Sequence, residues 1–136
     1  MVEIRVLYEG ELRTRCTHGP SGSELETDAP KDNEGRGERF SPTDLLATAV
    51  GSCMLTTMGI VARRRGWPLA GARARVEKHM VADPERRVGR VVVELELPAL
   101  PEEARPILER AGHACPVKKS LHADVAVDVS FAWGRV

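Results

Sequence analysis

Two of the three cysteines in this sequence occupy positions where a thiol could take part in redox chemistry. Cys53 lies in an apolar segment with helical periodicity, and Cys115 opens a later Cys-Pro-Val sequence that begins a short helix. A cysteine at a helix N-cap faces unpaired backbone N–H groups and the positive end of the helix dipole, and both lower a thiol pKa. Helix position alone therefore favours Cys115 as the more reactive thiol, although an inert capping cysteine is the commoner case. If the fold brings the two sulfurs together, the chain has a dithiol for redox chemistry.

Cys53 has small neighbours, which let another element approach the helix closely: Ala49, Gly51, Ser52 and Thr56. A buried free thiol is most often an inert core residue. A thiolate in an apolar site needs a charged partner to stabilise it. Arg36 or Arg39, in the polar segment before the helix, could reach Cys53 and supply that charge.

Other chemistry is less well supported. Cys16-Thr17-His18 and His113-Ala114-Cys115 could each supply two zinc ligands, but no CxxC or HxxxH spacing accompanies them. A hydrolase that uses Cys115 and His113 would normally need a third group to orient the histidine. The chain has no Gly-rich phosphate loop. We assign Cys16 no role, and we expect no cofactor and no metal.

The segment that carries Cys53 predicts a long helix over about 42–65. Ser41 is a suitable N-cap, Pro42 fits the first helical position, and Asp44 lies in the first turn, where the dipole favours an acidic residue. Gly66 follows a basic last turn and ends the helix. Six residues at helical spacing predict the buried face: Leu46, Ala49, Val50, Cys53, Thr57 and Ile60.

The remaining pattern predicts a single α+β domain over residues 1–136 with mostly antiparallel sheet. Alternation predicts strands over 2–8, 12–18, weakly 23–27, 71–81, 88–97 and from Val125 to the last residues. A second helix is expected over about 101–112, and a helical turn from Cys115 to about Leu121. The polar, glycine-rich residues 28–41 form a long loop, with a functional loop and a mobile surface connection about equally favoured.

Bulk properties narrow the range of partners. The 20 basic and 20 acidic residues give a formal net charge of zero, so charge offers no case for binding nucleic acid or a membrane surface. No apolar run is expected to approach the ~20 residues of a membrane span. The first residues have no apolar signal core. We therefore expect a cytoplasmic protein whose cysteines are not a structural disulfide framework.

Two stretches together resemble the OsmC/Ohr family of thiol-dependent peroxidases. SPTDLLATAVGSC, ending at Cys53, is similar to the family's Pro-x-x-Leu-Leu-x-Ala-Ala-x-x-x-Cys helix. ACPVKKSL, which contains Cys115, is similar to its Cys-Pro-Val-Ser-x-Ser/Val-Leu segment. The order of elements fits over nearly the whole chain. The resemblance implies an OsmC-like α+β fold and an intertwined homodimer, with two sites at the interface that each contain residues from both subunits.

The resemblance also implies an activity, the reduction of organic hydroperoxides in oxidative-stress defence. Cys53 would be the peroxidatic thiolate, and Cys115 would resolve its sulfenic acid into a disulfide. An external dithiol would then reduce that disulfide. These roles reverse the ranking that helix position suggests. Arg39 or Arg36 would stabilise the thiolate and polarise the peroxide oxygen.

One position departs from the family pattern. The family's peroxidases carry a Glu directly after the helix-starting Pro, where it orients the arginine, and Thr43 stands there in this chain. Asp44 is the next residue and the candidate replacement, turned ~100° around the helix. The departure supports an alternative, an OsmC-like dimeric binding or redox-sensing protein with little turnover. A third interpretation is a reduced pair of cysteines with a purely structural role.

Overall fold

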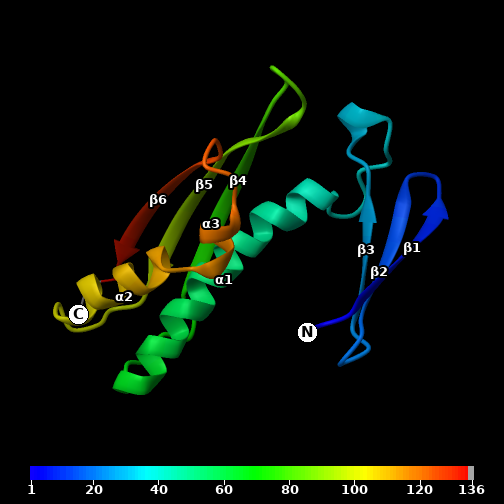
Figure 1. The fold of residues 1–136 in the computed structure, drawn as a ribbon. Coiled ribbons are helices and arrows are strands. Elements are labelled where there is room, and N and C mark those ends of the chain that lie inside the picture. The colour runs from blue at the N-terminus through cyan, green and yellow to red at the C-terminus, as the bar shows by residue number, and fades with distance from the viewer. Residues whose placement is uncertain (135–136) are drawn as a thin grey trace. The chain divides into compact units, whose positions relative to one another are not determined.

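The computed structural model describes residues 1–134, which form two compact units, residues 1–46 and the chain from Ala47 onward. Figure 1 shows the order of the elements along the chain. The first unit contains β1 (Ile4–Gly10), β2 (Arg13–His18), β3 (Glu24–Asp28) and the short 3-10 helix η1 (Lys31–Asn33). The second contains most of α1 (Pro42–Arg65), then β4 (Arg73–Val81), β5 (Arg87–Leu97), α2 (Ala104–His113), α3 (Pro116–Ser120) and β6 (Ala126–Trp133). The α+β class expected from the pattern is confirmed.

The first unit is an antiparallel sheet in the order β1-β2-β3. Val6 pairs with Cys16, which pairs with Leu25, so the three residues line up across the sheet. The three predicted strands are confirmed, including the weak third one. Ile4, Val6 and Tyr8 are all exposed in the single chain, although their alternation is typical of a strand with one buried face.

The second unit is a three-stranded sheet, order β4-β5-β6, with helices packed on one face (Figure 1). The alternation predicted for 88–97 is confirmed, because the inward residues of β5 are buried while Arg90, Glu94 and Glu96 are exposed. A Cβ built at Gly51 would lie 2.6 Å from Val76 Cγ2, so this glycine lets α1 approach β4 closely. The largest fully buried side chains include Met54, Met58, Leu95, Leu108, Val50, Val91 and Val93.

β6 runs parallel to β5, whereas β4 is antiparallel to it. The expectation of mostly antiparallel sheet did not include this parallel pair. A parallel neighbour requires a crossover connection of a dozen or more residues. Residues 98–125, which contain α2 and α3, provide it. The crossover therefore places Cys115, which lies between the two helices, beside the helical face of the sheet.

The predicted extent of α1 is confirmed, but of the six residues predicted for its buried face only Val50 is fully buried. The buried residues are Ala47, Val50, Gly51, Met54, Met58 and Ala62. Leu46 and Ile60, expected inside, are exposed in the single chain. The helix is apolar around nearly its whole circumference, so periodicity could not select the face that packs. Cys53 lies at the edge of the buried face and is half-buried.

α1 also corrects the expectation that no apolar run is long enough to cross a membrane. An 18-residue window of this 24-residue helix has a mean hydropathy of 1.8. Length and composition alone therefore permit a span. Core helices of soluble proteins pass the same test, and 33% of the window is buried within the chain. The finding is weak evidence for a membrane segment.

Candidate active site

The two candidate thiols meet where α1 passes the turn between α2 and α3. Cys53 and Cys115 lie close enough for each thiol to shift the pKa of the other. Cys115 is fully buried, whereas Cys53 is half-buried. Both belong to the second unit, so one compact body holds the pair together. Proximity of the two sulfurs is the first requirement for disulfide formation.

Cys115 is the N-cap of α3, as the Cys-Pro sequence predicts. Its Sγ accepts a hydrogen bond from the Lys118 backbone N–H at 3.4 Å, and Pro116 occupies the first turn. The Val117 backbone N–H lowers the pKa of both thiols. Because proline has no N–H, the first free donors of this helix are those of Val117 and Lys118. These two groups favour a thiolate at the site.

The electrostatics separate the two thiols. Burial acts to raise the pKa of Cys53, but hydrogen bonds from Cys115, the Val117 N–H and Thr57 hold that pKa below its ordinary value. Burial, followed by the hydrogen bond with Cys53, raises the pKa of Cys115 above its ordinary value. The order of the two pKa values is therefore the reverse of the one that helix position suggests. Burial and the hydrogen bond that this thiol gives to Cys53 together outweigh the capping N–H groups.

Thr57 is a neighbour of Cys53 that the sequence placed only on an apolar stripe. Its Oγ1 lies 3.9 Å from Cys53 Sγ and donates to the Cys53 carbonyl oxygen at 2.7 Å. The four-residue spacing along a helix could have identified this contact. The Val117 N–H could not have been identified from side-chain type, because a backbone donor leaves no such signal.

The two candidate arginines lie in the first unit, on the loop between β3 and α1. An Arg36 Nη lies 3.9 Å from a Glu11 carboxylate oxygen, and Arg39 Nε lies 3.7 Å from one of Glu26. Both guanidinium side chains are about half exposed. Because these residues and the thiols belong to different units, the assignment of an arginine to Cys53 stays a prediction.

Asp44, the candidate replacement for the family's glutamate, takes part in a capping box at the start of α1. The Asp44 N–H donates to Ser41 Oγ at 3.0 Å, and Asp44 Oδ2 accepts from the Ser41 N–H at 2.8 Å. Ser41 is thus the predicted N-cap. Thr43 Oγ1 lies 3.2 Å from Ser41 Oγ. The arrangement gives Asp44 a structural role at the helix start, and its role toward an arginine stays a prediction.

Comparison with known proteins identifies the family of this chain. The sequence matches the family described as OsmC-like protein over residues 35–130. This chain belongs to the OsmC-like family. The match spans both cysteines, the predicted arginines and Asp44. None of the curated proteins matches the sequence.

Solved structures support the same fold for this OsmC-like chain. A Psychrobacter arcticus protein, provisionally described as an osmotic-stress-induced and detoxification response protein, is 45% identical with a TM-score of 0.91, over 96% of each chain. The Legionella pneumophila organic hydroperoxide resistance protein OsmC is 19% identical with a TM-score of 0.77, over 97% of this chain and 96% of that one. The Bacillus subtilis organic hydroperoxide resistance protein OhrB is 17% identical with a TM-score of 0.66, over 96% and 97%.

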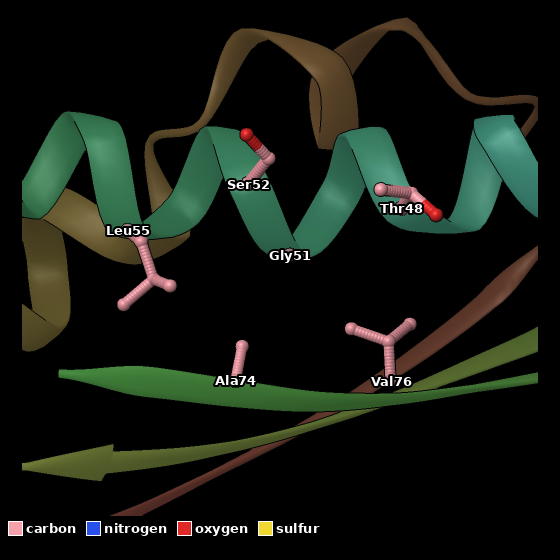
Figure 2. A pocket seen from close by; sticks show the side chains of 6 residues that line it. All are labelled: Thr48, Gly51, Ser52, Leu55, Ala74 and Val76. Atoms are coloured by element: carbon pink, nitrogen blue, oxygen red, sulfur yellow. The ribbon is translucent and has the colours of Figure 1, made fainter.

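A groove of about 280 Å³ lies between α1 and β4 of the OsmC-like chain (Figure 2). Ala74 and Val76 rise from β4 toward Gly51, with Thr48, Ser52 and Leu55 along α1. Gly51 is two residues from Cys53, so the two positions point ~160° apart around the helix. The groove is therefore separate from the dithiol. Within residues 1–134, no cluster of three or more His, Cys, Asp or Glu side chains could hold a metal ion.

Proposed function

We propose that this OsmC-like protein is a thiol-dependent peroxidase that reduces organic hydroperoxides. The observation that carries the proposal is the position of Cys53 beside Cys115 at the N-cap of α3, where the pKa of Cys53 is lowered and that of Cys115 is raised. An attacking thiol reacts as its thiolate, so the lower pKa assigns the first attack, on the peroxide, to Cys53. The names of the family's hydroperoxide resistance proteins agree with this chemistry.

The reaction proceeds in three steps. The Cys53 thiolate attacks the outer peroxide oxygen; the O–O bond breaks, and the leaving alkoxide takes up a proton to become the alcohol. Cys53 is then a sulfenic acid. The Cys115 sulfur attacks the Cys53 sulfur, an S–S bond forms, and hydroxide leaves as water with the Cys115 proton. An external dithiol returns the pair to two thiols by exchange and is itself oxidised.

An arginine of the 28–41 loop, Arg39 or Arg36, would stabilise the Cys53 thiolate and the charge that develops on the peroxide oxygens. The proposal includes a homodimer with residues of both copies at each site. Apolar side chains that a single chain leaves exposed support it, among them Ile4, Val6 and Ile60. Free cysteines fit the proposed cytoplasmic location.

The test is continuous turnover of cumene hydroperoxide with a dithiol reductant. The purified protein should consume peroxide over many cycles, and Cys53→Ser should reduce consumption to the uncatalysed rate. Equal rates for the two proteins would contradict the peroxidase proposal. Sedimentation velocity on the same sample reports the dimer separately from the activity.

One observation favours a second function, a binding or redox-sensing protein that turns over poorly. Thr43 replaces the family's arginine-orienting glutamate, and the adjacent Asp44 carboxylate is held in a capping box. Such a protein would form the Cys53–Cys115 disulfide with one equivalent of peroxide and then stop, even with excess dithiol. Counting disulfides and peroxide consumed per chain separates the two functions.

A further inference from the structure

The loop that carries the candidate arginines is folded on itself. Pro30 O accepts hydrogen bonds from the N–H groups of Asn33 and Gly35, both at 2.9 Å. At its two ends the Gly37 N–H donates to Ala29 O at 3.1 Å, and the Asp28 N–H donates to Phe40 O at 3.1 Å. Residues 28–29 therefore meet residues 37–40 and close the two ends of the loop together; we call this contact the neck of the loop. A loop closed in this way does not fit the expectation of a mobile connection.

The Asp28 carboxylate lies at this neck and is only 1% exposed. It accepts two hydrogen bonds from Arg13, from Nε at 2.7 Å and from an Nη at 2.8 Å. The same carboxylate accepts the Glu38 backbone N–H at 3.1 Å. One side chain therefore joins the start of β2, the end of β3 and the final residues of the loop.

The Arg13–Asp28 pair contributes more to the geometry of the loop neck than to the stability of the fold. A buried ion pair often contributes little compared with apolar packing of the same volume. A two-point contact between a guanidinium and a carboxylate, however, fixes both the distance and the orientation of its partners. Glu38, the residue that Asp28 holds, directly precedes Arg39, and Arg39 Nε lies 3.7 Å from Glu26 on β3.

We propose that Arg13 and Asp28 are positioning residues, which close the neck of the 28–41 loop and so fix where Arg39 is presented. The role rests on the proposed function, in which an arginine of this loop acts on Cys53. Neither residue touches the peroxide in this scheme; both act through the backbone of Glu38. The carboxylate that organises the arginine segment would then be Asp28, which stands at the start of the loop in the sequence, whereas Thr43 follows it.

Hydrogen exchange of the Glu38 amide tests the closed neck. Asp28→Asn removes the charged acceptor of the Glu38 N–H, and Arg13→Lys removes the two-point contact that holds this acceptor in place. Each variant should therefore raise the local opening equilibrium and speed exchange at Glu38 by at least ~10-fold. Glu24→Gln, which changes an exposed carboxylate on the same strand, should leave that rate unchanged. Unchanged exchange at Glu38 in both neck variants would overturn the proposal. Exchange of the β5 amides shows whether each variant is folded. If Asp28→Asn does not fold, the test is made with Arg13→Lys.

The pH profile of Cys53 alkylation by iodoacetamide, followed by mass spectrometry, tests the positioning role. Asp28→Asn should move the profile to higher pH in the wild-type background and have no further effect in the Arg36→Ala/Arg39→Ala background. An equal shift in both backgrounds, or none in either, would overturn the positioning role. Peroxide turnover is measured separately. If Asp28→Asn shifts the alkylation profile only in the wild-type background but the wild-type protein does not turn over peroxide, the peroxidase proposal fails and the positioning role stands.

Discussion

The two units of this chain hold their reactive groups in opposite ways. From Ala47 onward, Cys115 is fully buried in an apolar core, and Cys53 lies at the edge of that core against the start of α3. In residues 1–46 the candidate arginines are half exposed and lie near carboxylates of Glu11 and Glu26. The loop that carries them is held at its neck by the buried Asp28 carboxylate, which accepts hydrogen bonds from Arg13 and from the Glu38 N–H. The thiols therefore lie in or beside an apolar core, whereas the arginines lie on a loop held by polar contacts.

The two units would therefore have different roles in the proposed reaction. Packing and backbone N–H groups of the second unit account for the order of the two thiol pKa values without any arginine. The first unit would then add charge stabilisation during the attack on peroxide. Four tests follow, from the largest expected effect to the smallest.

Removing the resolving thiol should have the largest effect. Cys115→Ala should abolish sustained peroxide turnover, because no second thiol captures the Cys53 sulfenic acid. It should also raise the pKa of Cys53, because a hydrogen bond that favours the thiolate is lost. Steady-state assays measure the first effect and the pH profile of Cys53 alkylation the second. An unshifted profile would show that the second unit does not set this pKa through Cys115.

Removing the arginines should slow the first oxidation of Cys53. Arg36→Ala/Arg39→Ala should lower the second-order rate constant with cumene hydroperoxide by about 10²-fold, the scale of one lost electrostatic group. Stopped-flow detection of the sulfenic acid measures this step alone. Arg64→Ala, in the last turn of α1, is the matched control and should react at the wild-type rate. If the double variant is oxidised at the wild-type rate, neither arginine takes part in the reaction and the reactive groups lie in the second unit alone.

Two glycines of α1 test the packing of the second unit. Gly51→Ala places a Cβ 2.6 Å from Val76 Cγ2, so it should lower the free energy of unfolding by about 1–3 kcal/mol. Gly59→Ala meets nothing within 4 Å and should stabilise the helix by about 0.5–1 kcal/mol. Urea unfolding of both variants measures these values. If Gly51→Ala and Gly59→Ala change the free energy of unfolding by similar amounts in the same direction, close packing of α1 on β4 is contradicted.

Asp44 lies at the boundary between the units and should have the smallest effect. Asp44→Ala breaks the capping box with Ser41 and should cost about 1 kcal/mol of stability. If capping is its whole role, the rate of Cys53 oxidation should change less than about threefold, under 1 kcal/mol of activation free energy. A rate loss of ~100-fold would instead assign Asp44 the arginine-orienting role of the family's glutamate.

Local signals were sufficient where one segment determines its own structure. The capping residues and length of α1, the alternation in β5 and the N-cap position of Cys115 could all be predicted. The second helix was predicted from residue 101 but begins at Ala104, so Pro106 lies in its first turn. The N–H groups of a first turn have no partner within the helix, so a proline there costs no hydrogen bond. The parallel β6 could not be predicted from alternation, because alternation is the same in either strand direction.

The sequence by itself determined the family, the two cysteines and the elements that carry them, because motifs and periodicity are local properties. Only the tertiary structure decided which thiol has the lower pKa, since burial and the Val117 N–H depend on how α3 meets α1. It also decided which face of the uniformly apolar α1 is buried. The Arg13–Asp28 pair became visible only once the register of β2 against β3 placed the two residues opposite each other. Contacts between distant residues are set by packing and register, which no single segment encodes.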